Sequence, residues 1–265
     1  MHIFDSIILG VVQGLAEFIP ISSSGHLIIA RELLGWHGST DLAFDATLQL
    51  ATVLAVIVYF RKDLIQLVYS FGKLIQRKEV AHEDKTMLWA IGIGTIPAVI
   101  AGLLLEHSME TIFRSAYLVA VTLVAGSLFM IIAEKYAPQN QTLTPLRGLT
   151  IGLFQCLALI PGFSRSGATI SGGLFAGLSR EAAARFSFLL SVPIIFGSGA
   201  KKLLELLTQG GVTTEIPALF IGSFVAFGIG ILAIDFLMKY LKKHTLYPFV
   251  AYRLILAGVV FLVLL

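Results

Sequence analysis

Six apolar stretches of membrane-spanning length constrain the fold more than any other feature of the sequence. They cover residues 44–60, 87–105, 116–133, 184–200, 217–238 and 248–265. A helix needs about 20 apolar residues to cross the roughly 30 Å of hydrocarbon in a bilayer. The chain is 57% hydrophobic and only 13% charged, whereas soluble domains carry about 25% charged residues. The sequence therefore predicts an all-α integral membrane protein with six transmembrane helices.

Basic residues fall mainly on one side of these spans, which alternate in direction. That side holds Arg61, Lys62, Lys73, Arg77, Lys78, Lys85, Lys135, Arg147, Arg180, Lys239, Lys242 and Lys243, and the other side holds Arg31, Arg114, Lys201 and Lys202. Loops rich in Lys and Arg remain in the cytoplasm. We therefore expect both termini to face outward. The charges lie in short connections and form no continuous stripe, so nucleic acid is not an expected partner.

Two further features limit the chemistry that the chain can carry. It begins apolar at Ile3 without a basic region or a small-residue cleavage site, so no removable signal peptide is expected. Cys156 is the only cysteine, which excludes an intramolecular disulfide and a cysteine-based metal site. The sequence leaves the oligomeric state open, with a homodimer as one alternative.

An internal repeat relates the two halves of the chain. Residues 10–28, "GVVQGLAEFIPISSSGHLI", align without a gap with residues 152–170, "GLFQCLALIPGFSRSGATI", at a constant offset of 142 residues. Apolar matches arise by chance, but a shared Gln and a shared Ser-x-Ser-Gly in register indicate duplication. The polar, proline-containing stretch 137–145 suits a linker. We predict a first repeat at 1–138 and a second at 145–265, which together form one membrane domain.

Each predicted repeat consists of a polar-centred segment followed by three spans. Because three is odd, the second repeat is inverted if the polar segment does not cross, as in many transporter folds. The Pro-Ile-Ser-Ser-Ser-Gly sequence at 20–25 interrupts a helix, and lipid cannot satisfy the freed backbone groups. We therefore expect two re-entrant helix-loop-helix segments whose tips meet inside the membrane and favour an anion.

Ionisable and polar residues flank the first tip. Gln13 and Glu17 are spaced i, i+4 and project from one helix face, and His26 follows the serines Ser22, Ser23 and Ser24. Ionisable residues within a membrane segment are costly and indicate function. The alternative is that Glu17 and His26 pair with each other or with a core arginine.

The second tip supplies an arginine between hydroxyl groups. Arg165 lies between Ser164 and Ser166, and Thr169 follows one turn later. A guanidinium holds two phosphate oxygens at once, and hydroxyls satisfy further lone pairs. The alternative role for Arg165 is a structural counter-ion for Glu17, and the two roles are compatible. Together the tips contain the groups needed for phosphoryl transfer to serine or water.

The motifs "QGLAEFIPISSSGHL" and "PGFSRSGAT" resemble the two signature regions of the undecaprenyl-pyrophosphate phosphatase, or bacitracin-resistance, family, over essentially the whole chain. The resemblance implies a phosphatase of the bacterial cytoplasmic membrane that opens to the outer face. Its substrate would be undecaprenyl pyrophosphate, and its product would recycle the lipid carrier for cell-wall synthesis. It also implies dependence on Mg²⁺ or Ca²⁺. Some family members have a second carboxylate where this chain has Gln13, so Glu17 would be the main protein ligand of the metal.

We expect Ser23 to be the nucleophile, with Glu17 or His26 relaying protons. Arg165 would grip the pyrophosphate, and Gln13, Ser22, Ser24, Ser164, Ser166 and Thr169 would contribute to substrate binding. Ser22, Ser24 and an activated water are alternative nucleophiles. A transporter or flippase for an anionic lipid or anion is the competing function, because inverted repeats with broken helices also build carriers. Glu17 and His26 favour the enzyme, since translocation needs neither a nucleophile nor a proton relay.

Overall fold

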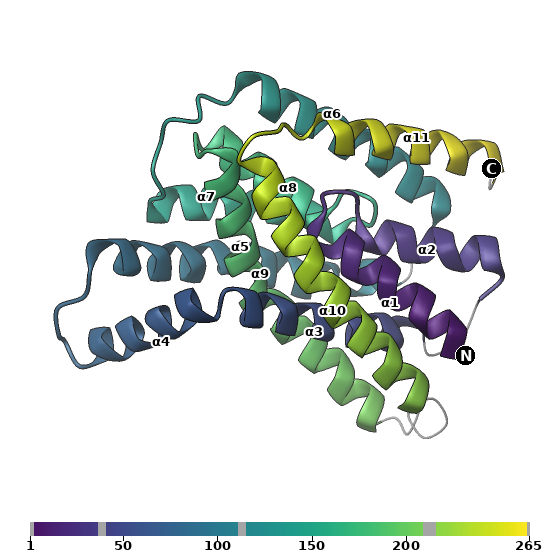
Figure 1. Cartoon of the computed structure of the whole chain (residues 1–265), viewed down its shortest axis with the longest axis horizontal. Coiled ribbons are helices and arrows are strands. Elements are labelled where there is room, and N and C mark those ends of the chain that lie inside the picture. Colours follow the sequence, from purple (N-terminus) through teal and green to yellow (C-terminus); the bar gives the residue numbers. More distant parts are fainter. Residues whose placement is uncertain (1–2, 37–40, 111–114, 209–215, 264–265) are drawn as a thin grey trace.

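The computed structural model describes residues 3–36, 41–110, 115–208 and 216–263, and within these ranges every regular element is a helix (Figure 1). The all-α prediction is confirmed. Arg114, one of the charges expected on the outer side, lies outside the described residues, as do the last two residues of the predicted span 248–265.

The helices follow the two halves of the sequence. The first half contains α1 (Ile3–Phe18), α2 (Ser23–Leu34), α3 (Asp41–Tyr59), α4 (Arg61–Ile75), α5 (His82–Glu110) and α6 (Ala116–Tyr136). The second half contains α7 (Pro145–Gln155), the short 3-10 helix η2 (Cys156–Leu159), α8 (Arg165–Phe175), α9 (Arg180–Thr208), α10 (Ile216–Leu241) and α11 (Tyr247–Val263).

Each of the six predicted spans corresponds to one helix. Among the described residues, four helices contain stretches long and apolar enough to cross a membrane: His82–Leu105, Ala116–Tyr136, Arg180–Lys201 and Pro217–Leu241. The predicted spans in α3 and α11 correspond to shorter apolar stretches, Phe44–Tyr59 and Tyr247–Leu262. The chain is therefore a multi-pass membrane protein, and crossing by α3 and α11 stays a prediction.

Helix α4 lies between the predicted spans 44–60 and 87–105, where the sequence predicts a basic loop. Its side toward α5 buries Leu67 and Ser70, and the Ser70 hydroxyl donates to the Asp84 carboxylate of α5 at 2.7 Å. Gln66 donates to the same carboxylate at 2.8 Å. The many Lys and Arg residues of this segment do not exclude a helix, because a helix can expose its charged residues to solvent and still pack its other face against a neighbour.

Close helix crossings join the two halves. Helix α1 packs along α10, and α7 packs along α5. A Cβ atom at Gly10 would lie 2.5 Å from the carbonyl oxygen of Gly222, and one at Gly152 would collide with the carbonyl of Gly94. Glycines in such small-xxx-small patterns let membrane helices approach closely. The first and second halves of the described chain therefore interlock along these helix crossings.

Replacing Gly152 with alanine is expected to destabilise the protein, because the new methyl group must push α7 away from α5. Overpacking of this kind costs about 1–3 kcal/mol. Gly228 in α10 provides a matched control, since a Cβ there meets nothing within 4 Å. Thermal unfolding in detergent should show a lower midpoint for Gly152→Ala and no loss for Gly228→Ala. Equal midpoints would contradict the close crossing.

Two short turns interrupt the helices at related positions. The first turn, residues 19–22, separates α1 from α2, and the second turn, residues 160–164, separates η2 from α8. The serines that cap the following helices, Ser22 and Ser164, both have a φ of 78°. Each serine accepts a hydrogen bond from the backbone N–H three residues later, as N-cap residues do. Equivalent sequence thus forms equivalent local structure 142 residues apart.

Candidate active site

The two turns contact each other. The Ser22 hydroxyl accepts a hydrogen bond from the N–H of Gly162 at 3.1 Å, and the Ser166 hydroxyl donates to the carbonyl of Ile19 at 3.3 Å. Gly162 has a φ of 92°, and a Cβ atom there would collide with the Thr122 hydroxyl. Only glycine fits this conformation and this space. The polar residues of both repeats therefore meet in one site.

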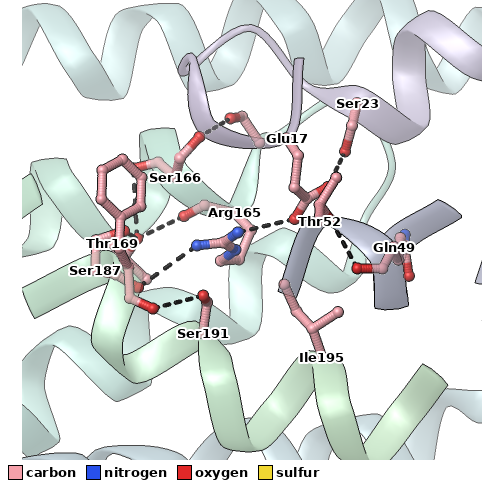
Figure 2. Close-up of polar contacts among 12 residues, drawn as sticks. Glu17, Ser23, Gln49, Thr52, Arg165, Ser166, Thr169, Ser187, Ser191 and Ile195 are labelled. Atoms are coloured by element: carbon pink, nitrogen blue, oxygen red, sulfur yellow. Dashed lines mark hydrogen bonds and ion pairs between the residues drawn. The ribbon is translucent and has the colours of Figure 1, made fainter. Parts of the chain in front are cut away.

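Glu17 lies at the centre of the site. Its side chain is only 6% exposed, yet both carboxylate oxygens are hydrogen-bonded. Oε2 accepts from Gln13 at 3.0 Å and from the Ser23 hydroxyl at 2.6 Å, and Oε1 accepts from Arg165 Nη2 at 2.8 Å. Figure 2 shows Ser23 and Arg165 reaching Glu17 from different segments. A buried carboxylate is stable only with such partners.

Ser23 has the environment of an activated nucleophile. A hydroxyl that donates a short hydrogen bond to a carboxylate can transfer its proton as it attacks. Among the three neighbouring serines, Ser23 is the one whose hydroxyl contacts Glu17. The Ser22 hydroxyl accepts from Gly25 and Gly162, which uses its lone pairs for structure. Ser24 is half-buried in the first turn of α2. Among the serines, the geometry therefore favours Ser23 over Ser22 and Ser24.

Arg165 bridges the two halves. Besides its ion pair with Glu17, its Nη1 donates a long 3.5 Å hydrogen bond to the carbonyl of Ser187 in α9. Its Nε is buried and has no partner within the described ranges. A guanidinium has five N–H donors, so Arg165 retains capacity for an anion. The contact with Glu17 is also the counter-ion role considered above, and both roles fit the geometry.

The hydroxyls on either side of Arg165 organise the start of α8. Ser164 accepts from the N–H of Gly167 at 3.1 Å, and the Ser166 hydroxyl lies 3.3 Å from that of Ser164. Thr169 is fully buried, donates to the carbonyl of Arg165 at 2.7 Å and lies 2.5 Å from the Ser187 hydroxyl. Their contacts fix the N-terminus of α8, where free N–H groups and the helix dipole favour an anion.

His26 lies beside the cluster, and its ring nitrogens hydrogen-bond to residues other than Glu17 and Ser23. Its Nδ1 is 2.7 Å from the carbonyl of Ser22, and its Nε2 is 2.7 Å from the hydroxyl of Tyr252 in α11. Because a carbonyl only accepts, Nδ1 must carry a proton, and in the neutral ring Nε2 accepts from Tyr252. The rings stack nearly parallel with centroids 5.6 Å apart. Of the two expected proton relays, Glu17 is therefore the one in contact with Ser23.

The residues partly fit the divalent cation implied by the resemblance. The amide oxygen Oε1 of Gln13 is buried without a partner among the described residues, and the Gln13 amide adjoins the Glu17 carboxylate. Both are oxygen donors of the kind that Mg²⁺ and Ca²⁺ prefer. The described residues include no group of three acidic, histidine or cysteine side chains that could hold a metal. Phosphate oxygens and water would have to complete the coordination.

Comparison with known proteins identifies the family. The model of the family "Bacitracin resistance protein BacA" matches residues 6–259. The chain belongs to this family. It is also 45% identical to the undecaprenyl-diphosphatase of Myxococcus xanthus, over 100% of this chain and 90% of that protein. It is 43% identical to the undecaprenyl-diphosphatase of Chlorobaculum tepidum, over 97% of this chain and 95% of that protein. It is also 43% identical to the undecaprenyl-diphosphatase of Thermobifida fusca, over 100% of this chain and 90% of that protein. The resemblance based on the two motifs is confirmed.

Proposed function

We propose that this family member is a membrane phosphatase that hydrolyses undecaprenyl pyrophosphate to undecaprenyl phosphate and inorganic phosphate. The observation that carries the proposal is the buried Glu17 carboxylate, which accepts from Ser23 on one oxygen and from Arg165 on the other. This arrangement combines a base, a nucleophile and an anion-binding group. The names of the relatives support the choice of substrate.

In the proposed reaction the Ser23 oxygen attacks the terminal phosphorus while Glu17 accepts the hydroxyl proton. The bond between that phosphorus and the bridging oxygen breaks, and undecaprenyl phosphate leaves with the bonding electrons. Glu17 passes the first proton to the departing oxygen of undecaprenyl phosphate and then deprotonates a water molecule that attacks the phosphoserine. The bond between phosphorus and the Ser23 oxygen breaks, the Ser23 oxygen takes up the proton from Glu17, and inorganic phosphate is released. Arg165 and the N–H groups at the start of α8 stabilise the charge on the transferring phosphoryl group. Attack by water without a phosphoserine is the alternative.

A divalent cation, if bound, would be held by Glu17 and Gln13 Oε1 together with phosphate oxygens. The cation would neutralise part of the negative charge on the pyrophosphate oxygens. The Gln13 amide also donates to Glu17 at 3.0 Å and so orients the carboxylate.

Release of inorganic phosphate in detergent micelles tests the proposed function, because micelles support no gradient. Purified protein should release phosphate from undecaprenyl pyrophosphate in the presence of Mg²⁺ or Ca²⁺. A series of lipid diphosphates would define the tail preference. Binding of the lipid without phosphate release under any divalent condition would favour the transporter or flippase instead. As a cellular test, overproduction should raise bacitracin resistance.

We also propose that the α1–α2 and α7–α8 pairs are re-entrant hairpins of an inverted repeat in the cytoplasmic membrane, with both termini and the site opening outward. Helices α2 and α8 have 12 and 11 residues, too few to cross about 30 Å of hydrocarbon. The start of α1 and the end of α11 lie at the same end of the molecule, away from the connection between α4 and α5 (Figure 1). This arrangement supports the predicted orientation.

Cysteine labelling tests this topology. In a Cys156→Ser background, we expect Phe4→Cys and Glu32→Cys to react with an impermeant reagent from outside. Leu146→Cys and Ala182→Cys should react only after the cells are permeabilised. All four positions are exposed. A crossing α1–α2 pair would instead place Phe4 and Glu32 on opposite faces, and that result would contradict the first re-entrant hairpin.

A further inference from the structure

Helix α11 places a fully buried arginine behind the two turns. Arg253 has no exposed surface, and no carboxylate pairs with it among the described residues. A buried charge without a counter-ion is costly and is retained only where its hydrogen bonds compensate. The contacts of Arg253 therefore indicate what the residue is for.

Those contacts join both turns to α6. Nη1 donates to the carbonyl of Pro20 in the first turn at 3.3 Å. Nη2 reaches the carbonyls of Gly162 and Phe163 in the second turn at 3.0 and 3.1 Å. On α6, Nε donates to the Ser127 hydroxyl at 3.1 Å, and Nη2 lies 3.2 and 3.5 Å from the carbonyls of Leu123 and Thr122. One planar group thus satisfies carbonyls of both turns.

Small residues on α6 make room for this group. A Cβ atom at Gly126 would collide with Nη2 of Arg253 and would lie 2.8 Å from the carbonyl of Phe163. One turn earlier, the Thr122 hydroxyl donates to the carbonyl of Pro161 at 2.5 Å. The second turn therefore rests directly on α6, and the guanidinium is held in a close-fitting slot.

We infer that Arg253 is a positioning residue that holds the two turns in the register in which Glu17, Ser23 and Arg165 meet. The inference rests on the proposed phosphatase function. The carbonyls that it binds in the two turns lie within three residues of Ser23 or Arg165 in sequence. A displacement of about 1 Å in a reacting group can cost about a hundredfold in rate. Loss of the hydrogen bonds from Arg253 to the two turns should therefore lower turnover more than it lowers substrate affinity.

Arg253→Lys tests the inference, because lysine keeps the charge but cannot bridge both turns with one planar fork. We expect kcat to fall by about a hundredfold with KM changed by less than about threefold. Gly126→Ala should act in the same direction, since its methyl group would press on both the guanidinium and the carbonyl of Phe163 in the second turn. Gly258→Ala in α11 is the matched control, because a Cβ there meets nothing within 4 Å. Ser127→Ala removes the hydroxyl that accepts from Arg253 Nε. It is the test variant to use if both Arg253→Lys and Gly126→Ala fail to fold.

The double variant Ser127→Ala/Arg253→Lys separates positioning from general stability, because the Ser127 hydroxyl accepts from Arg253 Nε. If both changes act through the guanidinium, the double variant should lose no more turnover than the worse single variant. Multiplied losses, or variants with lower melting temperatures but normal kcat at low temperature, would overturn the inference. Absence of turnover in the wild type would instead overturn the proposed function, and the inference with it.

Discussion

Replacing Glu17 with glutamine is expected to reduce turnover by about a thousandfold, within the range of general-base contributions. Glutamine has the same shape and can still accept a hydrogen bond from Ser23, but it cannot take up the hydroxyl proton. The change also removes the negative charge that pairs with Arg165 at 2.8 Å. Phosphate release by purified protein would measure the loss.

Glu134→Gln is a matched control for the loss of a buried carboxylate. Glu134 is 7% exposed and accepts from Arg180 Nε at 2.5 Å, in an ion pair that shares no residue with the site. The control should lose stability in detergent, because it leaves Arg180 without a charged partner. Its turnover per folded molecule should stay normal. Normal turnover per folded molecule in Glu17→Gln as well, with only the total turnover reduced, would show that Glu17 acts through stability alone.

Arg165→Lys is expected to keep the fold and to lower turnover by about a hundredfold or more, as for a transition-state donor worth roughly 3 kcal/mol. Lysine retains the charge for Glu17 but loses the planar fork and the free Nε donor. Thermal stability in detergent should change little. The same exchange at Arg180, which also pairs with a buried carboxylate, is the control and should leave turnover intact.

The counter-ion role of Arg165 predicts a different pattern. Lysine would then be tolerated, whereas Arg165→Ala would leave Glu17 buried without a cation and would lower stability markedly. Near-normal turnover in Arg165→Lys would contradict the proposal that the planar guanidinium of Arg165 binds the phosphate oxygens. Unfolding of Arg165→Ala in the same experiments would establish a purely structural role.

Much of the site was predictable because local rules and the repeat act together. Ser22 and Ser164 lie before new helices at matching repeat positions, and both cap those helices. The spacing of Gln13 and Glu17 placed both side chains on one helix face, where they hydrogen-bond. The repeat also indicated that Arg165 could approach Glu17. Structural features that depend on neighbouring residues or on the repeat can therefore be predicted from the sequence.

Contacts set by tertiary packing were not predictable in the same way. Ser187 and Tyr252 bind Thr169 and His26 from distant helices, and nothing local marks either residue. Arg253 did carry a signal, since it is a charged residue within the apolar run 248–265. Its partners are backbone carbonyls, which have no signature in the sequence. Helix α4 was missed because its exposed charges outweighed its packed face.

Trapping of the phosphorylated intermediate tests most directly whether Glu17, Ser23 and Arg165 form one phosphatase site. Protein mixed with undecaprenyl pyrophosphate carrying a radiolabelled terminal phosphate would be quenched in acid and digested. We predict label on Ser23, the serine whose hydroxyl donates to Glu17 at 2.6 Å, and no label in Ser23→Ala. Label that persists in Ser23→Ala, or rapid phosphate release from wild type with Ser23 unlabelled at every quench time, would contradict the account.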